Sequence, residues 1–259
     1  MLPSPVSPLV NSGVRARFVL DVAVGVAMSV AAVSAVGCGS KSLVGQTCTE
    51  PGKTQCDVLD NPDRLVRCDG TFFVTLAECA SQCVEKKPPV EHAGGPLSAD
   101  ETWVCADGPH VVTTPISVQD GVTLTIEQGS LLQLQPASRI DTTPAGRIVA
   151  VGIAGAEILV TDVNDTRGGF GDDGNGGLNV FAVDEGGGEP SDIEHVILEH
   201  GVQGLGVFGL SATTTAPTVK NNTLRDNLNF GILVSGCGDG AVIPDFTSDG
   251  NAFFGNGGE

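Results

Sequence analysis

The chain has 259 residues, with 31 acidic and 13 basic side chains and a formal net charge of −18. Because so acidic a surface repels phosphates, the composition excludes nucleic acid as a partner and disfavours anionic membrane surfaces. Thirty-six glycines, no tyrosine and one tryptophan argue against a helical protein and for a chain with many tight turns. A cationic partner, a neutral glycan or bound Ca²⁺ stays compatible with this charge.

Residues 1–37 have the order of an export signal. Two arginines precede an uncharged stretch of small apolar residues, 22–36, which is too short for a confident membrane span. Ala35-Val36-Gly37-Cys38 resembles a bacterial lipobox, in which Cys38 is lipidated and becomes the first residue; Ala35 stands where leucine is commoner. We expect a protein lipid-anchored at the outer membrane or cell surface. A secretory peptide cleaved without lipidation and an uncleaved anchor are the alternatives.

A cysteine-rich module is expected at 48–84, after a tether at 38–47. Export and close spacing favour disulfides over a metal, and zinc at the last two cysteines of the module is the weaker alternative. The odd total of seven after Cys38 leaves at least one thiol free, and spacing alone identifies neither that thiol nor the pairing. The six expected disulfide cysteines include one across a linker: Cys48, Cys56, Cys68, Cys79, Cys83 and Cys105.

The module is too small to bury a sufficient core, so its bridges must supply stability. Asp69-Gly70 stands between two apolar runs and predicts a hairpin turn. The order of cysteines and turns resembles small disulfide modules near the N-terminus of bacterial surface lipoproteins, a resemblance that implies no chemistry. Residues 85–96, with paired prolines and paired glycines, are predicted to be a linker.

The segment 97–259 is predicted to be all-β. Short apolar runs alternate with period two, glycine, aspartate, asparagine and proline separate them, and helical periodicity is absent. A sandwich, a barrel and a β-solenoid all fit this pattern. Few separators are two-residue hairpin turns, and a weak repeat favours the solenoid. Residues 193–201 align with 219–227 at an offset of 26, and residues 221–227 align with 250–256 at an offset of 29.

An ordered set of residues within 102–135 carries a family resemblance: Trp103, Pro109, Val118, Gly121, Val122, Leu124, Ile126 and Gly129, with Gln128 where proline is usual. The segment resembles the first coils of right-handed parallel β-helix proteins of the pectin-lyase-like superfamily. Residues 217–234 resemble the later coils, so the resemblance covers 97–259. It implies a right-handed parallel β-helix of about six coils behind the disulfide module.

Four asparagines are predicted to form two structural ladders. Coils of a β-helix stack about 4.8 Å apart, so residues one coil apart lie over one another. The repeat places Asn222 and Asn251 at one bend, and Asn227 and Asn256 at a second. Asparagine tolerates the left-handed backbone of such bends, and stacked amides hydrogen-bond along the column.

The same offset places Glu194 beside Lys220 and Glu199 beside Arg225. Opposite charges on adjacent strands stabilise each other, and we interpret both pairs as structural. The superfamily includes polysaccharide lyases and hydrolases, so a carbohydrate-active enzyme is the alternative function. In that case Lys220 and Arg225 are the first candidates for a catalytic role.

Other motifs give weaker hypotheses. Residues 168–176 contain one copy of the GGxGxD pattern of Ca²⁺-binding rolls, so Asp172 and Asp173 are a candidate Ca²⁺ site; a flexible acidic loop is the alternative. His195 and His200 are five apart, which places them on opposite strand faces and argues against a shared metal. Two GxGxxG strings lack the strand–turn–helix context of a nucleotide site.

These patterns together predict a cell-envelope lipoprotein whose β-helix is a non-catalytic surface scaffold or binding module. We expect the protein to contact the membrane through its lipid anchor. A polysaccharide or a surface protein is the candidate ligand. No cofactor other than Ca²⁺ is expected. A fragment of a larger adhesin is the further alternative, because the chain stops soon after a coil motif, whereas solenoids normally cap their last coil.

Overall fold

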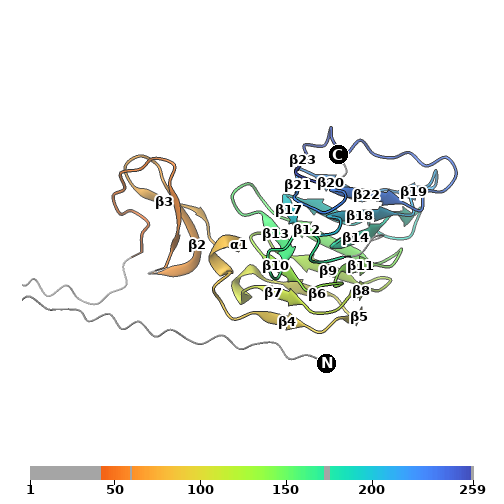
Figure 1. Ribbon diagram of the computed structural model, residues 1–259, viewed down its shortest axis with the longest axis horizontal. Coiled ribbons are helices and arrows are strands. Elements are labelled where there is room, and N and C mark those ends of the chain that lie inside the picture. The colour runs from red at the N-terminus through yellow and green to blue at the C-terminus, as the bar shows by residue number, and fades with distance from the viewer. Residues whose placement is uncertain (1–41, 59, 172–175, 258–259) are drawn as a thin grey trace, which may run out of the picture. The chain divides into compact units, whose positions relative to one another are not determined.

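The apolar runs form a parallel β-solenoid. The structure is a computed structural model that describes residues 42–58, 60–171 and 176–257. From residue 90 onward, successive turns stack their strands in parallel, about six turns in all (Figure 1). Parallel pairing between strands one turn apart excludes the sandwich and the barrel, which are built mainly from antiparallel neighbours.

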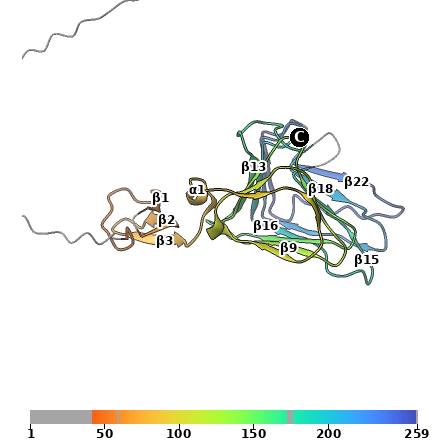
Figure 2. The ribbon, with the colours of Figure 1, turned by 90° about the horizontal axis from the view of Figure 1, so that it is seen from below.

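Three parallel sheets of seven, six and five strands make up the described part of the solenoid, and they lie on three sides of its core (Figure 2). The seven-stranded sheet contains β4 (Val90–His92), β7 (His110–Val112), β10 (Leu131–Leu134), β13 (Ile158–Asp162), β17 (Val196–Glu199), β21 (Thr223–Arg225) and β23 (Ala252–Phe254). The six-stranded sheet contains β5 (Gly95–Leu97), β8 (Ile116–Val118), β11 (Ile140–Thr142), β14 (Leu178–Phe181), β18 (Leu205–Phe208) and β22 (Ile232–Ser235). The five-stranded sheet contains β6 (Glu101–Trp103), β9 (Thr123–Ile126), β12 (Arg147–Val151), β16 (Asp192–Glu194) and β20 (Thr218–Lys220).

Columns of apolar side chains fill the interior. In the five-stranded sheet Ile126, Ala150, Ile193 and Val219 lie in register on four successive turns, and all are buried. Period-two alternation places every second side chain of a strand in this interior, where full burial of an Ile or Val contributes about 1.5–3 kcal/mol. A short antiparallel pair, β15 (Val183–Asp184) and β19 (Thr214–Thr215), lies outside the three sheets.

The predicted linker 85–96 is wrong in its second half. It contains β4 and most of β5, which pair in parallel with β7 and β8 and form the first turn of the solenoid. Proline and glycine are tolerated there because β4 and β5 are edge strands within the described residues, where a missing N–H breaks no ladder. The tether also pairs: the Gly45 N–H donates to the Phe73 carbonyl at 2.8 Å.

The cysteine module is a three-stranded antiparallel sheet of β1 (Thr54–Asp57), β2 (Asn61–Cys68) and β3 (Phe73–Ala77), followed by the short helix α1 (Ser81–Val84). The predicted hairpin joins β2 to β3, and its turn is held by the Asp69 carboxylate, which accepts the N–H groups of Thr71 and Phe72. Hydrogen bonds to these two backbone groups hold the pKa of Asp69 below its ordinary value.

Disulfides hold the module together and attach it to the solenoid. The three bridges are Cys48–Cys68, Cys56–Cys83 and Cys79–Cys105. Cys105 lies in the 3₁₀-helix η1 (Cys105–Asp107) between β6 and β7, so the third bridge spans the boundary as expected. Cys79 and Cys83 belong to different bridges, which removes the zinc alternative, and the free thiol among the described residues is the exposed Cys237.

No helix within the described ranges is long and apolar enough to cross a membrane. The predicted export signal 1–37 and the lipidation site Cys38 lie outside these ranges, as does the candidate Ca²⁺ pair Asp172 and Asp173.

Candidate functional site

The four predicted asparagines form the two ladders. The Asn222 amide donates to Asn251 Oδ1 at 3.0 Å, and the Asn227 amide donates to Asn256 Oδ1 at the same distance. Each also donates to a strand carbonyl one turn in the other direction, Ile193 for the first ladder. These amides are buried and satisfied within the protein, so they serve structure rather than ligand binding.

The left-handed residue of each bend is the one before the ladder asparagine, which corrects the expectation that the asparagine itself adopts that conformation. His195 (φ 51°) and Asn221 (φ 56°) occupy the first bend on successive turns. His200 (φ 67°) and Asp226 (φ 55°) occupy the second bend. Both histidines therefore line bends, and they belong to two separate sites, as their spacing predicted.

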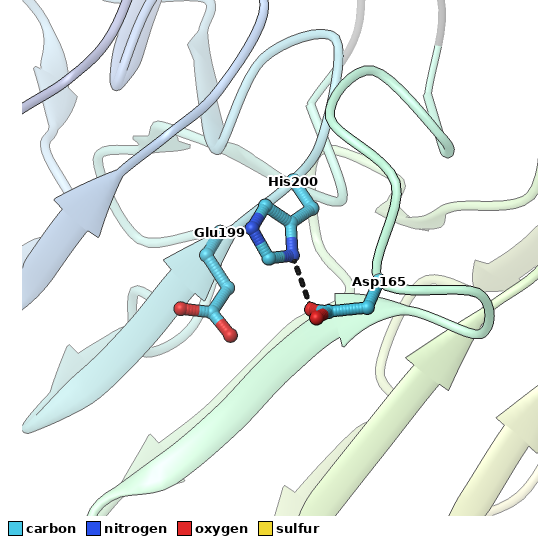
Figure 3. Close-up of side chains that lie close together, drawn as sticks. All are labelled: Asp165, Glu199 and His200. Atoms are coloured by element: carbon cyan, nitrogen blue, oxygen red, sulfur yellow. Dashed lines mark ion pairs between the residues drawn. The ribbon is translucent and has the colours of Figure 1, made fainter.

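His200 lies in a cluster with two carboxylates from different turns. Glu199 ends β17, and Asp165 lies in the turn after β13, also with left-handed backbone (φ 56°). The Asp165 Oδ1 is 2.8 Å from His200 Nδ1, and one ligand atom from each of the three side chains lies within 4.8 Å of the others (Figure 3). Thr161 Oγ1 is 3.3 Å from the same ring nitrogen.

Glu199 also forms the ion pair that the repeat predicted. Arg225 approaches one carboxylate oxygen, Oε2, with both Nε (2.6 Å) and Nη2 (2.5 Å). Glu199 is buried and pairs in register with Arg225 on the next strand, just as Glu194 pairs with Lys220. Since Arg225 uses only Oε2, the other oxygen of Glu199 is the one available to a further partner.

Asp162 lies next to this cluster and is 2% exposed. Its Oδ2 accepts the backbone N–H groups of Asn164 (2.9 Å) and Thr166 (3.0 Å), which shapes the turn that presents Asp165. Its Oδ1 has no hydrogen-bond partner. A Cβ at Gly169 would lie 2.3 Å from that Oδ1, so only glycine leaves room for the carboxylate in this position.

The cluster opens into a groove between α1 and the seven-stranded sheet. Two cavities of about 260 and about 320 Å³ share Ser81, Gln82 and Leu159, and we call them together the α1 groove. Hydrogen-bonding side chains line much of it: Ser81, Gln82, Gln133, Thr161, Asp165 and Glu199 in the first cavity, and Arg225 in the second. The Cys79–Cys105 bridge immediately precedes α1 and fixes one wall of the groove.

Another cavity, of about 510 Å³, is apolar and lies against β22 and β23. Phe230, Ile232, Phe246 and Phe253 line it, and Asp245 is its one titratable group. Hydrogen bonds from the Thr247 hydroxyl and from nearby backbone N–H groups hold the pKa of Asp245 low. This cavity lacks a cluster of reactive groups, so the α1 groove is the better candidate site.

The first turns of the solenoid carry a stack of His92, Trp103 and His110. Ring centroids lie 4.0 Å apart for His92–Trp103 and 5.3 Å for Trp103–His110, and the two imidazoles approach to 3.1 Å (Nε2 to Nδ1). Burial lowers the pKa of His92, and the neighbouring His110 lowers it further; burial also lowers the pKa of His110. The three rings pack against one another, and we interpret the stack as a structural feature.

Fold and site together define a class: an acidic parallel β-solenoid, stabilised by disulfides, with a polar groove along its seven-stranded sheet. Comparison of the chain with protein-family models, with curated proteins and with solved structures finds no match in any of the three.

Sequence reasoning singled out Glu199 but missed Asp165, the ion-pair partner of His200. Asp162 ends the apolar strand β13 and Asp165 lies three residues further on, which is a usable signal for a site at a strand end. The repeat could not align them, because Ile158 pairs with Val196 across a turn much longer than the later turns of 26 and 29 residues.

Proposed function

We propose that the protein is an exported lipoprotein of the bacterial cell envelope whose solenoid is a non-catalytic binding module for polysaccharide. The lipobox-like order before Cys38 supports anchoring, and three disulfides support an oxidising compartment. Membership in the pectin-lyase-like superfamily is part of the proposal. In its favour, residues that carry the resemblance, Trp103, Val118, Leu124 and Ile126, are core residues of a parallel solenoid.

The α1 groove is the observation on which the binding function depends. A sugar chain offers hydroxyl groups, which bind best to donors and acceptors that are already held in place. Ser81 and Gln82 stand on a helix fixed by disulfides, while Gln133 and Thr161 stand on stacked strands. The groove therefore presents amide and hydroxyl groups from two rigid walls, with little conformational entropy to lose on binding.

Charge narrows the ligand class to neutral or amino polysaccharides. The first cavity of the groove contains Glu85, Asp162, Asp165 and Glu199, and the Arg225 guanidinium in the second cavity is already bound to Glu199. Together with a net charge of −18, this arrangement repels polyuronates and other anionic chains.

A glycoside hydrolase is the second candidate, and one observation favours it. The Asp165–His200 pair with Glu199 nearby places carboxylates and an imidazole in one cluster, and such groups perform general acid–base chemistry. A lyase that uses Arg225 as proton abstractor is less well supported, because a guanidinium stays protonated and this one is held by Glu199 at two nitrogens.

Co-sedimentation tests the binding function. The whole chain carrying Cys38→Ser, with its disulfides oxidised, is mixed with insoluble neutral β-glucan, with chitosan and with polygalacturonate. We expect binding to the first two, and a loss of about tenfold or more in the double variant Gln82→Ala, Gln133→Ala. Gln128→Ala is the matched control, because Gln128 is exposed and outside both cavities.

Reducing ends are measured in the same tubes. Their release by the unaltered chain, lost with Asp165→Asn, would replace the binding module by the hydrolase. Equal sedimentation of the unaltered chain and the double variant would reject the α1 groove as the binding site. Anchoring has its own test: Cys38→Ser should move the protein from the membrane fraction to the soluble fraction.

A further inference from the structure

We infer that Asp165, Glu199 and His200 bind a divalent first-row transition-metal cation, for which Zn²⁺ is the probe. The inference depends on the geometry of this cluster and of the adjacent Asp162, and it does not require the proposed glycan function. The three side chains come from two turns of the solenoid and lie close together (Figure 3), and two of them, Asp165 and Glu199, line the first cavity of the α1 groove.

The distances suit a shared ion. Donors about 2.1 Å from one Zn²⁺ lie roughly 3.0–3.4 Å from each other. Asp165 Oδ1 and His200 Nδ1 are 2.8 Å apart, slightly closer than this range, and the three ligand atoms all lie within 4.8 Å of one another. The Asp165 side chain is 79% exposed, so it can move by the small distance needed to place all three donors around one ion.

A second feature points to a cation independently of the cluster. Asp162 lines the same cavity, is 2% exposed, and has one carboxylate oxygen without any hydrogen-bond partner. Burying such an oxygen is unfavourable unless a positive group or a donor compensates it. The carboxylate can occupy this position because residue 169 is glycine, since any Cβ there would overlap it. A cation held by the neighbouring Asp165 supplies the missing charge.

The donor set indicates the kind of metal. One imidazole with two carboxylates suits Zn²⁺ or Mn²⁺, whereas Ca²⁺ and Mg²⁺ prefer oxygen alone. Cysteine is excluded as a ligand within the described groove, because the nearby Cys79 and Cys83 are in disulfides. Three protein donors leave coordination positions for water or for a hydroxyl group in the groove.

Arg225 gives the site a distinctive response. Its guanidinium holds Glu199 Oε2 and places a positive charge beside the proposed ion, so it competes electrostatically with the metal. Removing that charge with Arg225→Gln should therefore tighten metal binding several-fold. A purely structural cluster would show no such gain.

Isothermal titration of the tag-free whole chain carrying Cys38→Ser with ZnCl₂, MnCl₂ and CaCl₂ tests the site. We expect one saturable Zn²⁺ per chain, weakened about tenfold or more by Asp165→Asn and by His200→Asn. His195→Asn is the matched control, because His195 has the same left-handed backbone on the neighbouring bend. Cys237→Ser controls for the exposed free thiol and should bind Zn²⁺ unchanged.

The inference fails if Zn²⁺ does not saturate a site, or if its affinity survives both Asp165→Asn and His200→Asn. It also fails if His195→Asn weakens binding as much as His200→Asn, or if Ca²⁺ alone binds. Should His200→Asn not fold, Asp165→Asn decides by itself, since its exposed side chain contributes little to the core. Glycan sedimentation with and without EDTA is scored separately, so failure of either idea leaves the other intact.

Discussion

Asn222 and Asn251, separated by 29 residues in the chain, stack on one another at the same bend of consecutive turns. The Asn251 Oδ1 accepts both the side-chain amide and the backbone N–H of Asn222, at 3.0 and 2.9 Å. Asn222 in turn accepts the Val196 N–H one turn away. One column of side chains thus satisfies backbone groups that a bend would otherwise leave unpaired.

Removing a ladder amide should destabilise the solenoid. Asn222→Ala leaves the Val196 N–H and the Ile193 carbonyl without their partner in a buried place, at about 1–3 kcal/mol for each unsatisfied group. Guanidinium denaturation of the variant measures the loss. Asn229→Ala, at a half-buried position outside the ladders, is the control. An equal loss of stability in the two variants would show that the ladder hydrogen bonds do not contribute to the stability of the solenoid.

Breaking the Cys79–Cys105 bridge should lower stability and impair the groove. The double variant Cys79→Ser, Cys105→Ser reopens a loop of 26-residue separation, for which about 2–4 kcal/mol is typical. Because the bridge positions α1, glycan binding should also weaken. Thermal melting and co-sedimentation give the two readouts, with Cys237→Ser expected to match the unaltered chain. Loss of stability with unchanged glycan binding would show that the groove does not need the bridge to bind glycan.

The histidine stack should make stability depend on pH. Burial, first of all, depresses the pKa of His92 and of His110, so the unfolded chain takes up protons more readily than the folded chain. Stability is therefore complete above the unfolded pKa of about 6.5 and declines as the pH falls below it, towards the folded values. Glu101 and Asp107 oppose this effect but do not reverse it.

Denaturation midpoints at pH 7.5 and pH 5.5 measure this dependence. We expect the midpoint to drop at the lower pH, and the drop to shrink in the variant His92→Gln, His110→Gln. His195→Asn should leave the drop unchanged, since this residue lies outside the stack. A drop of the same size in the double variant would assign the pH dependence to other groups.

Gly169→Ala should disturb the turn that presents Asp165. The new Cβ would lie 2.2 Å from the Asp162 carboxyl carbon, and overpacking of this kind costs about 1–3 kcal/mol. Zn²⁺ affinity should fall with it. Gly238→Ala is the comparison, because its Cβ meets nothing closer than 3.2 Å. Two variants of equal stability would mean that Asp162 moves aside freely.

The sequence by itself determined the all-β class, the solenoid, the two asparagine ladders and the Glu199–Arg225 pair. Each of these follows from local alternation or from a repeat of constant length, and both are visible in the chain without coordinates. The offsets of 26 and 29 residues are the separations at which Asn227 reaches Gly201 and Asn256.

Only the tertiary structure decided the first turn and the candidate site. Residues 90–97 have a linker's composition, and pairing with β7 and β8 makes them strands. Asp165 and His200 meet because a long, irregular turn lies between their strands, and no periodic pattern encodes its length. The α1 groove depends on which cysteines pair, and spacing leaves that choice open because bridge formation depends on distances in the folded chain.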